Sequence, residues 1–471
     1  MASDWVEASL GDFVDHQKGF IFKSKDYQDE GELIVRVSDF TDRSIDITSC
    51  NKIDKSRAGE FQSVRLNVLD VVIATVGSWP KNPASIVGKT INVPKNADGA
   101  LLNQNAVRLR AVNEMDQRFL FFLLKNKGFQ SYIVSTAQGS ANQASITLKD
   151  IFKYTFNLPP LQEQKTIAHI LGSLDDKIEL NRQMNETLEA MAQALFKSWF
   201  VDFDPVIDNA LAAGNPIPDE LLERAEQRQA MQHSDNDKQA IRALFPDAFE
   251  FTEEMDWIPK GWKIIKVLDL SEKLTKGTTP SKADLSKAED EASIPFLKVM
   301  NIDNNGFIKA EKLENIPKSI HEGSLKRSII KEGDVLFSIA GTIGRTSIVP
   351  KKLDNSNVNQ AIAFIRLKDS KKSNFLLQLL KSKETQNIVH SKIVQAVQAN
   401  FSLTELGGLI LAEPSNNVFD SWFEKTESVF MKISDLQDNT SALTKLRDTL
   451  LPKLLSGELR IPDAAALVED A

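Results

Sequence analysis

The chain has 471 residues, of which 42% are hydrophobic and 26% charged, and its formal net charge is −8. These values are ordinary for globular protein, and the length predicts about three domains. No apolar run approaches the roughly 18 residues of a membrane span, and nothing resembles a signal peptide. The single cysteine, Cys50, excludes an internal disulfide and a cysteine-based zinc site, which favours an intracellular, reducing location.

Charge is distributed unevenly along the chain. The net charge is +1 for residues 1–157, −12 for 158–257, +8 for 258–412 and −5 for 413–471. Such asymmetry indicates two regions with basic surfaces on an acidic scaffold. Charge alone leaves two alternatives equally open, because surface lysines can bind DNA or simply keep a protein soluble.

The two more basic regions, together with the segments that follow them, repeat each other at an offset of about 256 residues. This period is far longer than the roughly 20–50 residues of a solenoid repeat, so it indicates a duplicated domain with its linker. A chain with two similar halves is suited to a target that also has two halves. The matching positions are Trp5 and Trp262, Asn103-Gln104 and Asn359-Gln360, Ser145 and Ser402, and Leu188 and Leu443.

Each repeated region is predicted to be a mixed α/β domain, which gives the whole chain an α+β fold. Short stretches of β-branched residues bounded by Gly, Asp, Asn or Pro are typical of strands, and clustered Phe and Leu at helical spacing are typical of helices. The predicted strands are Leu33–Val37, Val71–Val76, Val335–Ile339 and Ile362–Leu367, and the predicted helices are Gln117–Asn126 and Asn374–Lys383.

Gly-containing turns with basic residues occupy equivalent places in the two domains, at Gly77–Pro83 and Gly341–Arg345. Glycine permits close backbone approach, Lys and Arg can meet phosphate or guanine, and Asn can pair with adenine. These turns are candidate DNA contacts, and at even odds they are hairpin turns with solvated charges. The candidate DNA-binding residues are Lys18, Lys23, Lys25, Arg36, Lys81, Asn82, Lys276, Lys282, Lys298, Arg345, Lys351 and Lys352.

A long helix is predicted after each domain, from Pro160 to Phe200 and again after Pro414. Both carry apolar residues at alternating spacings of three and four, which favours a coiled coil over a core helix with a wider stripe. If the halves are related by an approximate two-fold axis, the helices pair antiparallel and span about 60 Å. The predicted seam consists of Leu171, Leu174, Ile178, Leu188, Leu195, Ile433, Leu436, Leu443, Leu450 and Leu454.

No catalytic or metal-binding residues are predicted. The chain lacks an adenine-methylation motif of the form Asn/Asp-Pro-Pro-Tyr/Phe, since Asn157–Pro160 has an inserted Leu, and its five histidines are scattered. Asp202, Asp204, Asp208 and Asp219 are interpreted as part of a solvated acidic linker and not as a metal site. The polar stretch Asn209–Asp237 is a candidate for partial disorder.

The succession of several motifs resembles the specificity subunit, often called HsdS, of type I restriction–modification systems. The resemblance covers essentially the whole chain in the right order, and its specificity lies in that order and not in any one motif. It rests on Leu158–Lys165 (LPPLQEQK), Leu174–Arg182, Phe200–Pro205, Leu244–Asp247, Ile258–Trp262 and Gly333–Gly344.

The resemblance implies two target-recognition domains, each reading one half of a bipartite, gapped DNA sequence in the prokaryotic cytoplasm. The conserved helices would dock two adenine-methylating modification subunits, which restriction subunits then join. S-adenosylmethionine, ATP and magnesium would be bound by those partners, and this chain would be non-catalytic. The implied segments are 1–157 and 258–412 for the recognition domains, 158–200 and 413–471 for the helices, and 201–257 for the connection.

One departure from the family pattern concerns the second helix. It follows Leu411–Val418, which lacks the LPPLQEQ form that precedes the first helix, so equivalent docking of two modification subunits is in doubt. The competing function class is a bivalent protein-binding scaffold, in which the two basic domains on a coiled-coil spacer hold acidic partner surfaces.

Overall fold

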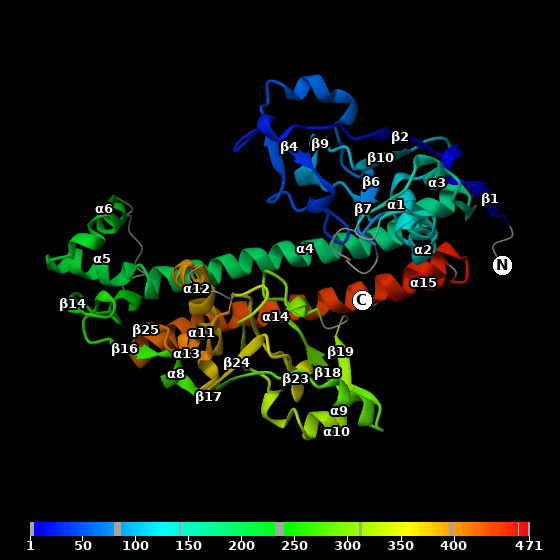
Figure 1. Cartoon of the computed structure of the whole chain (residues 1–471). Helices are drawn as coiled ribbons and strands as arrows, with labels where there is room; N and C mark the ends of the chain where they lie inside the picture. Colours follow the sequence, from blue (N-terminus) through cyan, green and yellow to red (C-terminus); the bar gives the residue numbers. More distant parts are fainter. Residues whose placement is uncertain are drawn as a thin grey trace. The chain divides into compact units, whose positions relative to one another are not determined.

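Two 40-residue helices, α4 (Leu161–Phe200) and α14 (Asn416–Leu455), are the longest elements of the computed structural model (Figure 1). The chain divides into a first unit of residues 1–179 and 442–471 and a second unit of residues 180–441. Each long helix therefore contributes one segment to each unit. No helix of the described residues is long and apolar enough to span a membrane. The structure describes residues 4–79, 86–140, 143–230, 240–309, 313–394, 400–459 and 461–469.

The first unit carries a head built on an antiparallel sheet with strand order β2-β10-β6-β8. Every residue of β6 is buried, and its side chains alternate between two apolar cores. Val71 and Ile73 pack with the helices, whereas Val72 and Ala74 face a second group around Ile34. The four strands are β2 (Val14–Lys18), β10 (Ala106–Ala111), β6 (Val71–Ala74) and β8 (Thr90–Asn92).

Asp116 caps the N-terminus of helix α1 (Gln117–Lys125), because its carboxylate accepts a hydrogen bond from the Phe119 backbone N–H at 2.9 Å. This side-chain cap satisfies one of the free N–H groups of the first turn. Six consecutive residues of α1, 119–124, are buried, so the helix is enclosed by the head. The other helices of this head are α2 (Lys127–Thr136) and α3 (Leu148–Phe152).

Three further sheets complete the first head. Strand β1 (Val6–Ser9) pairs with β13 (Thr155–Leu158), which leads directly into α4. A second sheet has the order β3-β5-β4-β9, and a third has the order β11-β12-β7. Their strands are β3 (Tyr27–Gln28), β5 (Asn51–Ile53), β4 (Glu32–Val35), β9 (Leu101–Leu102), β11 (Gln138–Ser140), β12 (Gln143–Ser145) and β7 (Val76–Gly77).

The second unit repeats the main sheet as β17-β24-β21-β22 and the terminal strand pair as β16-β25. Its sheet β19-β18-β23-β20 repeats the β5-β4-β9 pairing of the first head, with β20 as an additional edge strand. An ion pair on a buried aspartate marks the equivalence, because Arg110 binds Asp70 in the first head and Arg366 binds Asp334 in the second. The strands are β16 (Lys263–Lys266), β17 (Ser271–Lys276), β18 (Ala292–Leu297), β19 (Glu314–Pro317), β20 (Ile329–Ile330), β21 (Val335–Ser338), β22 (Thr346–Ile348), β23 (Ser356–Val358), β24 (Ile362–Leu367) and β25 (Ile410–Glu413).

The second head has its own set of helices, of which α11 matches α1 of the first head at the offset of the repeat. Phe375, Leu376 and Leu380 of α11 are buried, as the matching residues of α1 are. The helices are α8 (Val267–Leu270), α9 (Lys282–Lys287), α10 (Lys318–Glu322), α11 (Ser373–Lys381), α12 (Lys383–Val394) and α13 (Leu403–Gly407).

The long helices pack against each other in both units, and the predicted antiparallel pairing is confirmed. In the first unit, the early part of α4 shares a core with the late part of α14 and with α15 (Ile461–Glu469). In the second unit, the late part of α4 packs against the early part of α14 through Phe196 and Trp422. An Asn181 to Asn439 side-chain hydrogen bond of 2.8 Å joins the two helices there.

The residues of the predicted seam differ in burial. On α14 all five are buried, from Ile433 to Leu454. On α4 the first three are buried, whereas Leu188 and Leu195 are half-buried. Two polar residues, Thr440 and Arg447, also lie buried within the α14 seam. A polar residue in a seam disfavours other registers, because it needs a suitable partner across the interface.

The connection after α4 is structured and not simply solvated, which corrects the interpretation of its acidic residues. Asp204 and Asp208 are 98% buried, and they bind Arg224, Arg228 and Arg242. Buried carboxylates need such partners because an unpaired buried charge is costly. The connection contains α5 (Asp204–Ala213), α6 (Leu222–Ala230), β14 (Phe249–Thr252) and β15 (Asp256–Pro259), and residues 231–239 lie outside the described part.

Candidate nucleic-acid interface

An exposed lysine followed by a tightly packed glycine occurs at the same place in both heads. Lys18 ends β2 and Lys276 ends β17, and both are exposed. A Cβ atom on Gly19 would lie 2.0 Å from the Asn103 carbonyl oxygen, and one on Gly277 would lie 2.0 Å from that of Val358. Only glycine fits such a close backbone approach. The glycines therefore hold the two lysines at equivalent strand ends.

Four further candidate lysines are exposed: Lys23, Lys25, Lys282 and Lys351. Lys282 begins α9 in the second head. Among the described residues, none of these four side chains makes an ion pair with a carboxylate. Their charge is therefore accessible to an anion such as a DNA phosphate. With Lys18 and Lys276, they are the candidates whose positions suit contact with a ligand.

The remaining described candidates are engaged within the protein. The Arg36 guanidinium binds Asp39 at 2.8 Å, and this hydrogen bond raises the Arg36 pKa above its ordinary value. Lys298 binds Glu314 at 2.5 Å, and Lys352 binds Asp438 of α14 at 2.7 Å within the second unit. These side chains have structural partners that sequence reasoning did not assign. Their contact with DNA remains a prediction, and Lys81 and Asn82 lie outside the described residues.

Arg345 holds a loop in place. Its guanidinium donates to the Ile302 carbonyl at 2.6 Å, to the Val299 carbonyl at 3.3 Å and to the Asn304 side-chain oxygen at 3.0 Å. The residue lies in the turn before β22, whereas its partners belong to the segment after β18. Arg345 thus joins two segments that are distant in sequence. An effect of Arg345 on recognition would pass through that loop.

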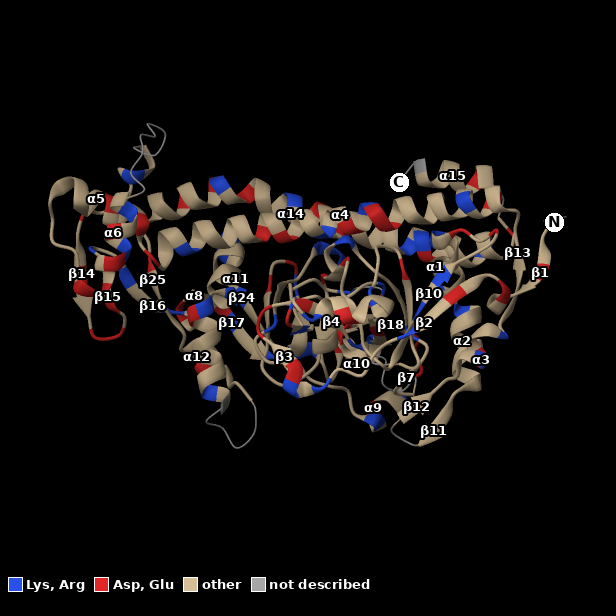
Figure 2. Ribbon diagram, turned by 90° about the horizontal axis from the view of Figure 1, so that it is seen from above, with Lys and Arg blue, Asp and Glu red and all other residues tan. Residues whose placement is uncertain are grey.

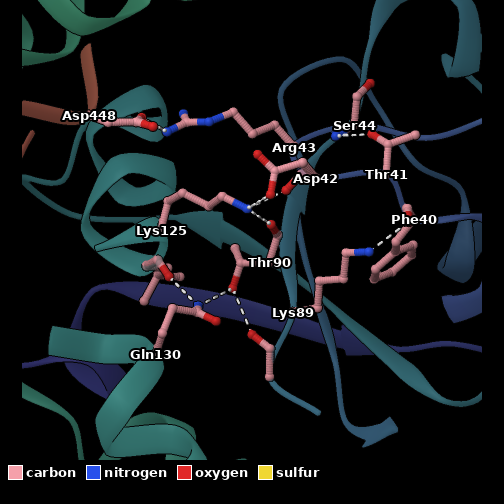
Figure 3. A network of polar contacts seen from close by, with 12 residues as sticks. Phe40, Thr41, Asp42, Arg43, Ser44, Lys89, Thr90, Lys125, Gln130 and Asp448 are labelled. Carbon is pink, nitrogen blue, oxygen red and sulfur yellow. Dashed lines mark hydrogen bonds and ion pairs between the residues drawn. The ribbon is translucent and has the colours of Figure 1, made fainter. Parts of the chain in front are cut away.

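Each head also contains a matching lysine that anchors a loop, and Figure 3 shows the lysine of the first head. In the first head, Lys125 at the end of α1 donates to the Asp42 carbonyl and lies 3.5 Å from the Asp42 carboxylate. In the second head, Lys381 at the end of α11 donates to the Asn305 carbonyl at 2.9 Å. Burial lowers the pKa of Lys125 to about 8. Lys125 and Lys381 are separated by the 256-residue offset of the repeat, so the sequence could have identified them as equivalent.

The same loop of the first head is tied to both long helices by a charged cluster. Arg43 binds Asp175 of α4 at 3.0 Å and Asp448 of α14 at 3.6 Å, and Arg447 of α14 binds Asp175 at 2.7 Å. Figure 3 shows Arg43 reaching Asp448 beside Lys125. Burial lowers the Arg43 pKa, while Asp175 opposes that shift. This cluster fixes the head to the helices within the first unit.

The second unit uses different residues for the equivalent attachment. Lys381 binds Glu189 of α4 at 3.1 Å, and Lys352 binds Asp438 of α14. A cleft of about 490 Å³ lies beside the first of these pairs, lined by Glu186, Gln378 and their neighbours. Among the described residues, no cluster of His, Cys, Asp or Glu could hold a metal ion. The two heads thus hold loops through Lys125, Arg345 and Lys381, and they expose the six candidate lysines described above.

Two similar α/β heads, each fixed to one part of an antiparallel helix pair, define a duplicated recognition scaffold. The family model for the type I restriction modification DNA specificity domain matches residues 2–190 and 259–411. The chain therefore belongs to the family of type I restriction–modification specificity subunits.

Individual relatives agree with this assignment. The HindI specificity subunit of Haemophilus influenzae is 31% identical over 72% of this chain and 77% of its own length. The EcoBI specificity subunit of Escherichia coli is 23% identical over 97% of this chain and 86% of its own length. A crystal structure of a type I system S subunit from M. genitalium has 15% identity and a TM-score of 0.50, covering 96% of each chain. That likeness supports the fold.

Proposed function

We propose that this chain reads a bipartite, gapped DNA sequence, with one head for each half-site. The observation that carries the proposal is the repeat of one main-sheet order in the two units of a chain that belongs to the specificity family. The two heads share the sheet order and the glycine-held lysine, but their net charges differ, at +1 and +8. Similar heads with different surfaces are suited to two different half-sites.

The exposed lysines would contribute affinity and the loops specificity. Lys18, Lys23, Lys25, Lys276, Lys282 and Lys351 would meet phosphates, which position a protein on DNA without reading its sequence. Arg345 and Lys125 would act indirectly, by holding loops that face the bases. This division follows from their contacts, since Arg345 and Lys125 are engaged with backbone carbonyls while the exposed lysines make no ion pair among the described residues.

The helix pair would dock the other subunits of the complex. Both helices carry mixed positive and negative charges along their solvent faces (Figure 2). Two modification subunits would bind the long helices and methylate adenine with S-adenosylmethionine. Restriction subunits would then join and use ATP and magnesium. Those groups would belong to the partners, so this chain would act without catalytic residues of its own, in the cytoplasm of a prokaryotic cell.

A domain exchange tests the proposal. Residues 1–157 are replaced by the corresponding head of another specificity subunit, and the methylated bases are sequenced in a host that also carries the modification subunit. We expect a gapped two-part motif in which the exchange alters one half and leaves the other unchanged. A methylome that the exchange does not alter would contradict the proposal and favour the bivalent protein scaffold.

A further inference from the structure

A short hairpin in the first head presents a face of uncharged polar side chains. Strands β11 and β12 form the hairpin, and β12 also pairs with β7, the strand after the buried β6. Gln138, Ser140, Gln143 and Ser145 are all exposed, whereas Ala144 is buried. We call these four exposed side chains the amide face. None of the exposed lysines discussed above belongs to it.

The pairing register places the four side chains together. Gln138 lies opposite Ser145, and Ser140 lies opposite Gln143. Residues directly opposite in an antiparallel pair point to the same side, and so do residues two apart on one strand. All four side chains therefore project from one side of the hairpin. The intervening Ala144 projects from the other side into the core of the head.

Local packing holds the hairpin to the head. The indole N–H of Trp79 donates to the Ser140 carbonyl at 2.7 Å, and the Ile146 N–H donates to the Thr75 carbonyl at 2.9 Å. A Cβ atom on Gly139 would lie 2.1 Å from the Gln143 carbonyl oxygen, and the φ of Gly139 is +152°. Glycine is thus needed for the close approach of β11 and β12. These contacts hold the hairpin that carries the amide face against the rest of the head.

The composition of this face suits bases better than phosphates or charged protein surfaces. No Asp, Glu, Lys or Arg occurs between Thr136 and Thr147. The glutamine side chains of Gln138 and Gln143 make no hydrogen bond with another described residue, so their amides are free to bind a ligand. A glutamine amide matches the donor and acceptor of adenine in the major groove, and that groove admits a two-stranded β-ribbon.

We propose that the amide face enters the major groove of DNA and that Gln138 and Gln143 read adenine in the half-site of the first head. The inference rests on the proposed DNA-reading function and adds the residues and the base. The hydroxyl groups of Ser140 and Ser145 lie on the same face and would form further hydrogen bonds with the DNA. In the second head, Ala340 forms a β-bridge with Asn400 at the place that corresponds to the pairing of β7 with β12, while residues 395–399 lie outside the described part.

The test uses the full chain assembled with its modification partner. Two readouts are taken: the methylome, and selection of bound duplexes from a randomised pool. For the double variant Gln138→Ala/Gln143→Ala, we expect discrimination at one or two adenine positions of one half-site to fall by about 5- to 150-fold. The other half-site serves as an internal control. The isosteric Gln143→Glu variant should lose adenine preference at one of these positions and favour cytosine, because a carboxylate accepts from the cytosine amino group.

Gln62→Ala is the matched control, since Gln62 is an exposed glutamine of the same head outside the hairpin. It should leave the motif unchanged. An unchanged motif in both hairpin variants would overturn the inference. So would an equal loss of binding to all sequences, because that would indicate a general contact with DNA or with a protein partner. A wild-type complex that selects no bipartite motif would instead overturn the proposed function itself.

Discussion

Asp175 and Asp176 are neighbours on α4 whose removal should have very different consequences. Asp175 accepts from Arg447 at 2.7 Å and from Arg43 at 3.0 Å, and the Arg447 side chain is only 5% exposed. Asp176 binds Arg118 at 2.7 Å but is 67% exposed. Asp175→Ala leaves the Arg43 and Arg447 guanidinium groups with Asp448 as their one remaining ion-pair partner among the described residues. Asp176→Ala removes a pair that water already screens.

Breaking a buried pair by removing one partner costs about 3–5 kcal/mol, and an exposed pair contributes about 0–1 kcal/mol. Because Asp448 stays within 2.7 Å of Arg447, we take the lower end for Asp175→Ala, about 3 kcal/mol. Hydrogen exchange of the slowest amides in β6 and α1 should then be about 100-fold faster, since 1.4 kcal/mol corresponds to a factor of ten.

The Asp176→Ala variant is the control for this measurement. Its slowest amides should exchange less than about fivefold faster than those of the wild type. Hydrogen-exchange mass spectrometry resolves peptides, so the first unit is followed separately from the second. Equal effects of the two substitutions would refute the reasoning that the cluster around Asp175 fixes the head to the helices.

Three further predictions concern single residues. The Lys125 pKa of about 8 lies below the ordinary 10.5, so the unfolded chain binds more protons between these values and stability should rise with pH there. Relative to Lys125→Met, the wild type should gain about 3 kcal/mol in unfolding free energy from pH 7 to 11. If the unfolding free energies of the two proteins changed with pH in parallel, the prediction would be contradicted. Cys50 is buried, and its pKa is raised to about 12, so a thiol reagent should label it only after unfolding; rapid labelling of the native chain would be the contrary result. Arg345→Ala should alter or abolish recognition of the second half-site by releasing the loop at Ile302, and full-strength methylation of an unchanged motif would refute this.

The sequence predicted the long helices and the main strands well because their patterns are local. Helix α4 begins one residue after Pro160 and ends at Phe200, as expected, and β24 has the predicted bounds Ile362–Leu367. Apolar periodicity and proline positions are properties of short windows. The helix pairing followed from a seam sustained over several heptads.

The partners of charged residues were not predictable in the same way. Asp204 and Asp208 looked like solvated linker residues because their arginines follow about 20 residues later and come close only through the fold of α5 and α6. Arg345 looked like a turn residue because its partners lie more than 40 residues away. Burial depends on such distant packing, so composition alone gives no sign of it.

The hairpin with the amide face was missed for a different reason. Its glutamine, serine and glycine residues are typical of loops, and no apolar alternation marks β11 or β12 as strands. The segment is extended because β12 pairs with β7 and because Trp79 braces its neighbour. The only sequence signal for this hairpin was that Gln138 and Gln395 lie one repeat offset apart. A single matching residue does not identify a strand unless the pairing register is known.

The most direct test of the claim that each head reads one half-site is to exchange the two heads one at a time. Residues 1–157 and residues 258–412 are replaced separately, and the methylated motif of each complex is sequenced. We predict that each exchange alters a different half of one gapped motif while the spacing stays the same, because the long helices are left intact. Exchanges that alter both halves together, or neither, would contradict the assignment of one head to each half-site.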